Sequence, residues 1–349
     1  MTRLLLVDDS PFVLDELARI ASTDGGFTVA GRAQNGAAAL ELADRLRPDL
    51  VSLDVDMPFL NGLATLKQLM TRRPVPTVML SALTGSESHL TFECLRLGAV
   101  DVLEKPGGHD GRDLALQRSD IVRRLRGAAG VDRSTVRLGH MRRPSPLPKR
   151  RPGDRCNSLL IASGGRAALG PLISLLNAFP TGSRSALVVR LDVPAPVTEA
   201  FARYAGRFTA LSLETDPEGT GLHPDTAYLL SAASTALVLS EPGGATLRSA
   251  GRRPAGETAR AVEYLFESAA EEFGAATTAA VLAGAPRGTV EGLRHVLARG
   301  GAVVGQSPAS SADGSTLRKA VEAGLIRPAR DLETLASQVG ARLGAGARA

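Results

Sequence analysis

Short apolar segments alternate with segments of helical spacing through the first third of the chain. The apolar segments predict buried strands, and the segments between them repeat apolar residues every three or four positions, as helices do. Five strands alternating with five helices predict a doubly wound α/β domain with a parallel sheet. The predicted strands are Leu4–Val7, Phe27–Ala30, Leu50–Leu53, Thr77–Leu80 and Val100–Leu103, and the predicted helices are Phe12–Ala21, Ala37–Leu46, Gly62–Thr71, Ser86–Leu97 and Leu114–Arg126.

A second α/β pattern covers residues 156–345, and it does not repeat the first. Its apolar segments again predict strands, with helical segments between them. We therefore expect two domains, 1–127 and 156–345. The predicted strands are Ser158–Ile161, Ser185–Val189, Thr209–Leu213, Ala227–Leu230, Thr235–Leu239, Thr277–Leu282 and Ala302–Val304, and the predicted helices are Ala167–Leu176, Thr198–Ala205, Glu257–Glu272, Val290–Arg299, Thr316–Gly324 and Leu332–Leu343.

Residues 128–155 separate the two patterns and are rich in proline and arginine. Proline and like charge both oppose packing, so this segment is predicted to be an extended, solvated linker. A plain tether is the first interpretation, and docking of the basic strip to an acidic partner or to nucleic acid is the alternative.

Composition restricts the function further. A hydrophobic fraction of 44% supports globular cores, while only 3% aromatic residues and no Trp argue against stacking on single-stranded nucleic acid. Much of the net charge of +5 falls in the linker. The two cysteines, Cys94 and Cys156, form neither a disulfide framework nor a metal-binding motif. No apolar run is long enough to span a bilayer, and the apolar start is too short for a secretory signal, so we expect a cytoplasmic protein.

Chemistry-bearing residues follow several predicted strands of the first domain. Asp8 and Asp9 follow the first strand, Asp54 the third, Ser81 the fourth and Lys105 the fifth. The carboxyl ends of parallel strands meet at one edge of the sheet, so three carboxylates converge there and favour a hard divalent cation such as Mg2+. Asp54 can then act as a nucleophile towards a phosphoryl group, with the Lys105 ammonium and the Ser81 hydroxyl on its oxygens.

These residues lie in segments that strongly resemble a response-regulator receiver domain with a flavodoxin-like fold. The segments are Leu-Leu-Leu-Val-Asp-Asp-Ser, Ser-Leu-Asp-Val-Asp-Met-Pro-Phe-Leu-Asn-Gly, Val-Met-Leu-Ser-Ala-Leu-Thr and Gly-Ala-Val-Asp-Val-Leu-Glu-Lys-Pro. The resemblance implies a histidine kinase as phosphodonor and Asp54 as phosphoacceptor. It also implies metal ligation by Asp8, Asp9, Asp54 and the backbone carbonyl of Asp56, with Ser81 as switch hydroxyl and Lys105 as phosphate contact. Receivers commonly carry an aromatic residue three positions before the lysine, and Val102 stands there instead.

The sequence of the first domain resembles the receivers of the chemotaxis protein-glutamate methylesterases in particular. Most of the second half resembles the hydrolase domain of the same family. Ile161–Leu169, Leu187–Pro194 and Leu282–Leu293 carry the resemblance in the second half. That family hydrolyses glutamyl methyl esters on chemoreceptors with a serine, a histidine and an aspartate, so the resemblance implies chemoreceptor or array proteins as partners.

The catalytic triad of that family is absent in register from this chain. The position of the serine, in Gly-Ala-Ser-Thr-Gly-Gly, is assigned to Ala162, that of the histidine, in Gln-His-Met-Pro, to Leu191, and that of the aspartate, in Gly-Met-Gly-Ala-Asp-Gly, to Gly288. A one-residue gap makes Ser163 an alternative nucleophile, but a serine needs a base to take its proton. His223, His295 and Asp192 offer no supported base.

These observations predict a phosphorylation-controlled response regulator of a chemotaxis-like two-component pathway. Its degenerate methylesterase-like domain would act as a docking module without catalysis. The alternative is an active protein-glutamate methylesterase with a rearranged site. A DNA-binding regulator is disfavoured, because the second half offers no basic recognition helix and linker arginines alone bind DNA without specificity.

Overall fold

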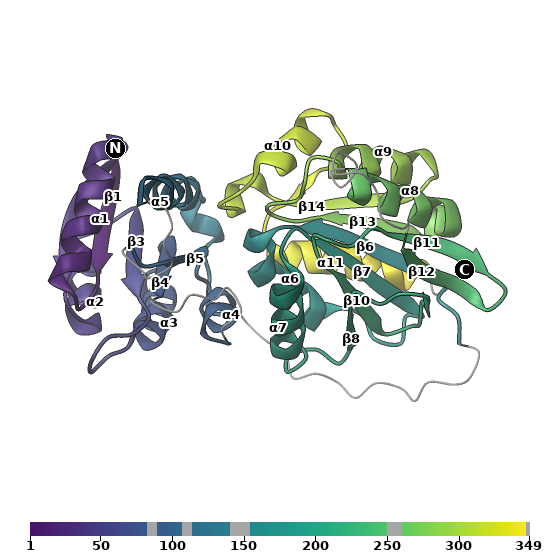
Figure 1. Ribbon diagram of the computed structural model, residues 1–349, viewed down its shortest axis with the longest axis horizontal. Helices are drawn as coiled ribbons and strands as arrows, with labels where there is room; N and C mark the ends of the chain where they lie inside the picture. The colour runs from purple at the N-terminus through teal and green to yellow at the C-terminus, as the bar shows by residue number, and fades with distance from the viewer. Residues whose placement is uncertain (82–88, 107–113, 140–153, 250–259, 347–349) are drawn as a thin grey trace. The chain divides into compact units, whose positions relative to one another are not determined.

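The computed structural model describes residues 1–81, 89–106, 114–139, 154–249 and 260–346. The chain divides into two compact units, one of residues 1–139 and 309–312 and the other of residues 140–308 and 313–349. Figure 1 labels the elements of both units along the chain. None of the helices within the described ranges has the length and apolar character needed to cross a membrane.

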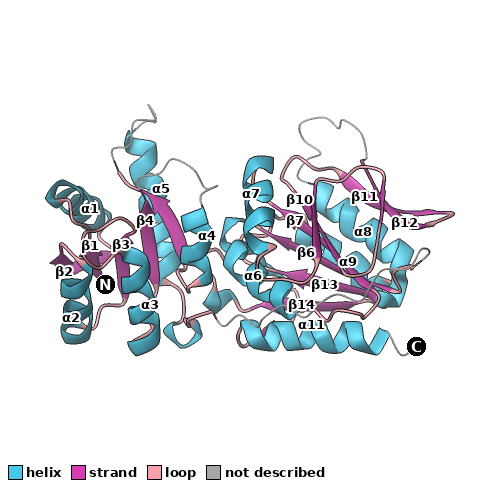
Figure 2. Ribbon diagram, turned by 90° about the horizontal axis from the view of Figure 1, so that it is seen from below, coloured by secondary structure: helices cyan, strands magenta, loops and turns pink. Residues whose placement is uncertain are grey.

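The first unit is a five-stranded sheet in the order β2-β1-β3-β4-β5, with every pair parallel. Helices α1 and α5 cover one face, and α2, α3 and α4 cover the other (Figure 2). The predicted doubly wound parallel fold is therefore confirmed. Its strands are β1 (Thr2–Val7), β2 (Phe27–Ala33), β3 (Leu50–Asp54), β4 (Thr77–Ser81) and β5 (Asp101–Glu104), and its helices are α1 (Pro11–Asp24), α2 (Gly36–Leu46), α3 (Gly62–Arg72), α4 (His89–Arg96) and α5 (Leu114–Ala129).

The helices that follow β1, β2 and β3 begin at side-chain caps. Ser10 accepts a hydrogen bond from the N–H of Val13 at 3.4 Å, and Pro11 occupies the first helical position of α1. Asn35 and Asn61 cap α2 and α3 in the same way, each at 2.9 Å. A capping side chain satisfies an otherwise unpaired N–H of the first turn, so the sequence itself fixes where each strand-to-helix turn ends. The turns after β1 and β3 lie next to Asp8, Asp9 and Asp54.

The boundary of the first unit lies beyond the predicted one. Ala128, Val131 and Val136 are buried, and Arg133 donates through Nε to the carbonyl of Pro74 at 2.9 Å. The prediction that residues 128–155 are a solvated linker is therefore wrong for 128–139, because apolar residues there pack against the first unit. Residues 140–153 lie outside the described ranges.

The second unit is a seven-stranded parallel sheet in the order β15-β14-β13-β6-β7-β10-β8. Helices α6 and α11 contact one another, as do α8 and α9, and the two pairs lie on opposite faces of the sheet (Figures 1 and 2). The strands are β6 (Ser158–Gly164), β7 (Ser185–Leu191), β8 (Ser212–Thr215), β10 (Thr226–Leu230), β13 (Thr277–Val281), β14 (Ala302–Gln306) and β15 (Pro328–Ala329), and the helices are α6 (Leu169–Ala178), α7 (Ala195–Ala205), α8 (Ala261–Phe273), α9 (Thr289–Ala298), α10 (Ser315–Glu322) and α11 (Leu332–Gly346).

A small antiparallel sheet, β11-β12-β9, completes this unit. Its strand β11 (Ala236–Glu241) was predicted, whereas β12 (Gly244–Ser249) and β9 (Thr220–Gly221) were not. The predicted strand at 209–213 is displaced, since β8 begins at Ser212. Thr209 instead donates its hydroxyl to the carbonyl of Leu176 at 2.8 Å, which holds it in the preceding loop.

Candidate functional site

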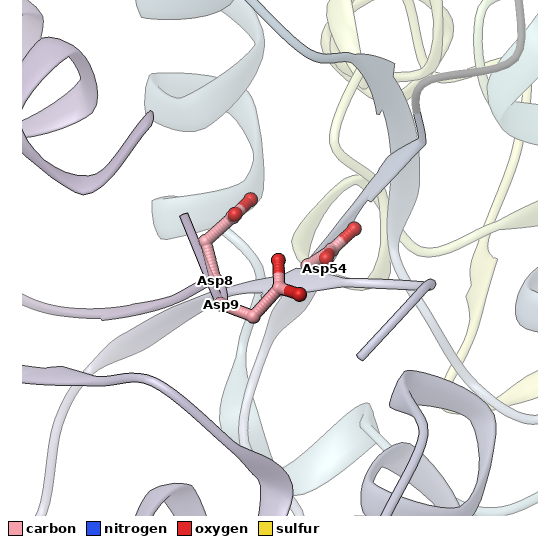
Figure 3. A group of neighbouring side chains, drawn as sticks. All are labelled: Asp8, Asp9 and Asp54. Carbon is pink, nitrogen blue, oxygen red and sulfur yellow. The ribbon is translucent and has the colours of Figure 1, made fainter. Parts of the chain in front are cut away.

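The functional residues of the first unit gather where its strand order reverses, between β1 and β3. Asp8 directly follows β1, and Asp54 is the last residue of β3. Both side chains are fully buried, and Asp9 is exposed beside them. One carboxylate oxygen from each of the three lies within 4.8 Å of the others (Figure 3). The three carboxylates therefore lie at the topological switch point, where ligands of doubly wound folds bind.

Lys105 follows β5 and closes the acidic group. Its Nζ lies 3.0 Å from Asp8 Oδ2 and 2.9 Å from Asp54 Oδ2. Apart from this cation, the two oxygens have no partner among the described residues. The other oxygens are held by the backbone, since Asp8 Oδ1 accepts from the N–H of Ser10 at 3.0 Å and Asp54 Oδ1 from that of Asp56 at 3.2 Å. Each carboxylate therefore keeps one oxygen directed into the site.

Burial controls the protonation of this centre. Burial raises the pKa of Asp54 to about 6, aided by the negative charge of Asp8 and opposed by Lys105. Burial also works against the Lys105 ammonium, but its contacts with Asp54 and Asp8 outweigh that effect and raise its pKa. A metal-free site therefore holds a charged lysine beside the Asp54 carboxylate, which remains costly to ionise.

The donor set fits a hard divalent cation. All three side chains offer oxygen atoms, the ligands that Mg2+ prefers, and two of these oxygens lack a neutral hydrogen-bond donor. The cluster is an acidic pocket of the kind at which receiver domains generally bind Mg2+.

The remaining predicted residues of the first unit lie on neighbouring strands. Ser81 ends β4 and is buried, and its carbonyl accepts from the N–H of Lys105 at 2.9 Å. Val102 is buried in β5, and its carbonyl accepts from Arg124 Nη2 at 2.8 Å. Arg124 on α5 also forms an ion pair with Asp101, and the sequence interpretation did not single it out.

The corresponding switch point of the second unit lies between β6 and β13. Ser163 is fully buried near the end of β6, and its Oγ accepts a hydrogen bond from Thr289 Oγ1 at 3.1 Å. Thr289 begins α9 directly after Gly288, the position assigned to the aspartate of the family. The hydroxyl of Ser163 therefore meets another hydroxyl where a base would be needed.

This contact bears on the two alignments of the serine. Side chains alternate along a strand, so Ala162 points to the sheet face opposite to that of Ser163. Only Ser163 lies beside the N-terminus of α9, which favours the alignment with a one-residue gap. The histidine position shifts as well, because the proline of Gln-His-Met-Pro matches Pro194 and the histidine then falls on Asp192, not on Leu191. Leu191 is a buried residue that ends β7, whereas Asp192 is exposed.

The candidate bases are elsewhere. His223 precedes β10 and so lies at the amino-terminal edge of the sheet, opposite the edge that carries Ser163. His295 lies late in α9, with Nδ1 3.6 Å from Glu267 Oε1 on α8. Within the described ranges, neither the Asp192 carboxylate nor any imidazole forms a hydrogen bond with the Ser163 hydroxyl.

A residue that sequence reasoning missed lies one strand away. Arg190 pairs with Ser163 in the β6–β7 register and is only 4% exposed. Its Nη1 donates to the carbonyl of Leu191 at 2.9 Å and its Nη2 to that of Ala232 at 2.7 Å. A charged residue directly after the predicted buried strand Ser185–Val189 was the signal that could have revealed it.

Comparison with known proteins matches both units. A family model described as the response regulator receiver domain matches residues 4–114, and one described as CheB methylesterase matches residues 160–339. Three curated relatives bear the name protein-glutamate methylesterase/protein-glutamine glutaminase. That of Pyrococcus abyssi is 27% identical over 340 residues, 97% of this chain and 92% of its own. The relative with this name and the number 2 from Xanthomonas oryzae pv. oryzae is 32% identical over 88% of each chain. The one with the number 5 from Myxococcus xanthus is 32% identical over 95% of each chain.

Proposed function

This chain belongs to the CheB methylesterase family and carries its receiver domain, and on that premise we propose that it is a phosphorylation-controlled regulator that binds without hydrolysing. Asp54 accepts the phosphoryl group from a histidine kinase, and the second unit docks to a chemoreceptor or array protein of a chemotaxis-like pathway. The names of the relatives describe enzymes that act on protein glutamate and glutamine side chains. The second unit would bind the same kind of partner as these enzymes without carrying out their reaction.

The first unit supplies the phosphorylation chemistry. Asp54 presents Oδ2 as the nucleophilic atom, and Lys105 lies 2.9 Å from it, in position to contact a phosphoryl oxygen. Asp8, Asp9, Asp54 and the backbone carbonyl of Asp56 would hold Mg2+, which when bound neutralises charge that develops during transfer. Ser81, at the end of β4, would supply the switch hydroxyl.

One observation carries the non-enzymatic part of the proposal. The Ser163 hydroxyl is fully buried against the Thr289 hydroxyl, which cannot serve as a general base near neutral pH. A triad that loses its base and orienting carboxylate keeps only the residual catalysis of the surrounding groups, orders of magnitude below a working enzyme.

The test measures release of methanol from methylated chemoreceptor by the full-length protein. The protein is assayed with and without a small phosphodonor and Mg2+, beside an active methylesterase of the same family. We expect no release above background in either state, together with Mg2+-dependent phosphorylation that Asp54→Asn abolishes. Release near the rate of the control enzyme, lost in Ser163→Ala, would refute the proposal and establish an esterase with a rearranged site.

A further inference from the structure

Arg190 is a buried cation without a carboxylate partner in the part of the chain that the structure describes. The side chain is 4% exposed, and its two hydrogen bonds go to backbone carbonyls. Its Nε is buried and has no partner. Asp192 and Asp216 influence it electrostatically, but neither forms an ion pair with it.

Such an arrangement is costly for the folded protein. A guanidinium carries five N–H donors, and only two of these bonds are made here. Removing an ion from water is costly in proteins unless an opposite charge and hydrogen bonds compensate it. Two carbonyl bonds leave most of this demand unmet, so the guanidinium favours a negatively charged group beside it.

Arg190 lies close to the carboxyl edge of the second sheet. It is the penultimate residue of β7, and the register sets it beside Ser163 on the same face of the sheet. The carboxyl edge of a parallel sheet is where ligands of α/β folds bind. The hydroxyls of Ser163 and Thr289 lie at this edge.

We propose that Arg190 anchors a carboxylate-binding site at this edge, and that its ligand is the free side-chain carboxylate of a glutamate on the docked partner. This rests on the proposed function, since it names what the docking unit recognises. A carboxylate can form a charge-assisted, two-pronged contact with a guanidinium, whereas a methyl ester or an amide carries no charge. The unit would thus distinguish unesterified glutamate from its methyl ester and from glutamine.

The experiment uses the full-length protein and one synthetic peptide in three forms. The peptide copies a glutamate-rich helix of a chemoreceptor from the same genome, with glutamate, its γ-methyl ester or glutamine at one central position. Binding is measured by fluorescence anisotropy, and the ester peptide is analysed by mass spectrometry after each run. The variants are Arg190→Gln, which removes the charge, and Arg190→Lys, which keeps the charge but loses the planar fork. Arg203→Gln is the matched control, because Arg203 is an exposed arginine of α7 in the same unit.

We expect the glutamate peptide to bind wild type and Arg203→Gln about 10- to 100-fold more tightly than the other two forms, the range of a charge-assisted hydrogen bond. Arg190→Gln should abolish this preference, and Arg190→Lys should retain part of it. If Arg190→Gln does not fold, the Arg190→Lys arm decides. Equal binding of all three peptides by wild type would overturn the carboxylate site and leave docking intact. A wild-type protein that binds none of them would overturn both, and cleavage of the ester peptide would overturn the proposed function alone.

Discussion

Replacing Asp54 by asparagine is expected to stabilise the first unit when no metal is bound. Asp54 is fully buried, and burial together with the neighbouring Asp8 raises its pKa from 3.8 to about 6. The native state therefore binds the proton more tightly than the unfolded chain does. For such a group, stability falls as the pH rises from 3.8 towards 6, and the full penalty applies above that range.

The magnitude follows from the size of the shift. A shift of about two units corresponds to about 3 kcal/mol at pH 7, because each unit is worth about 1.4 kcal/mol. At pH 5 only about half of this penalty is present, since the native carboxyl is then mostly protonated. Asparagine resembles the neutral acid in shape and removes the penalty. Asp54→Asn should therefore gain about 3 kcal/mol at pH 7 and about half of that at pH 5.

The assay is native-state hydrogen exchange of the full-length protein in chelator, read by mass spectrometry on peptides that cover β1 and β3. Asp44→Asn is the control, because Asp44 is exposed on α2 and its replacement should change stability by less than about 0.5 kcal/mol. Added Mg2+ should reduce the advantage of Asp54→Asn, since a bound cation stabilises the native carboxylates of wild type. A variant no more stable than wild type at pH 7, or one with the same gain at pH 5, would refute the reasoning.

Three further substitutions test the packing around the two sites, and a fourth, on α11, is the counterpart of the glycine substitution among them. Lys105→Met should destabilise the metal-free first unit by about 1–3 kcal/mol in the same exchange assay, because it leaves two buried carboxylates without their cation. Gly62→Ala should lower the melting temperature and slow phosphorylation, because its Cβ would lie 2.0 Å from the backbone carbonyl oxygen of Asp54. Gly340→Ala, with nothing within 4 Å, should instead stabilise α11 by about 0.5–1 kcal/mol. Thr289→Val should cost about 1 kcal/mol in urea unfolding by removing the hydrogen bond to Ser163, without creating or removing hydrolysis.

Hydrophobic periodicity predicted most of the fold because the buried strands of both sheets are short, nearly unbroken runs of apolar residues. Strand β1 reads Thr-Arg-Leu-Leu-Leu-Val, and its last four residues are fully buried. The acidic cluster could be predicted for a related reason. Parallel strands bring Asp8 and Asp54 to one edge whatever the helices between them contain. The ion pairs of Lys105 with both carboxylates follow from that convergence.

Features that depend on one contact were harder to predict. Residues 128–139 read as linker because prolines and arginines dominate the longer stretch, yet a few apolar side chains and Arg133 hold them against the first unit. Strand β12 was missed although Pro242-Gly243 supplies a turn signal between it and β11. The hydrogen bond between Thr289 and Ser163 joins residues that are 126 positions apart in the sequence, and no local pattern reveals it.

The polar residues at the second switch point are not explained by stability alone. Buried ionic groups can often be replaced by apolar residues of similar volume without loss of stability. Arg190→Met removes one buried cation with an unpartnered Nε and also removes the hydrogen bonds that the carbonyls of Leu191 and Ala232 accept from it, so the two effects largely cancel. We expect a change in the free energy of unfolding of less than about 1 kcal/mol. This change is measured by urea unfolding, followed by hydrogen exchange of the peptides that cover β7. A loss above about 3 kcal/mol would show that the guanidinium is a structural cross-link between two loops, and that stability suffices to explain its presence.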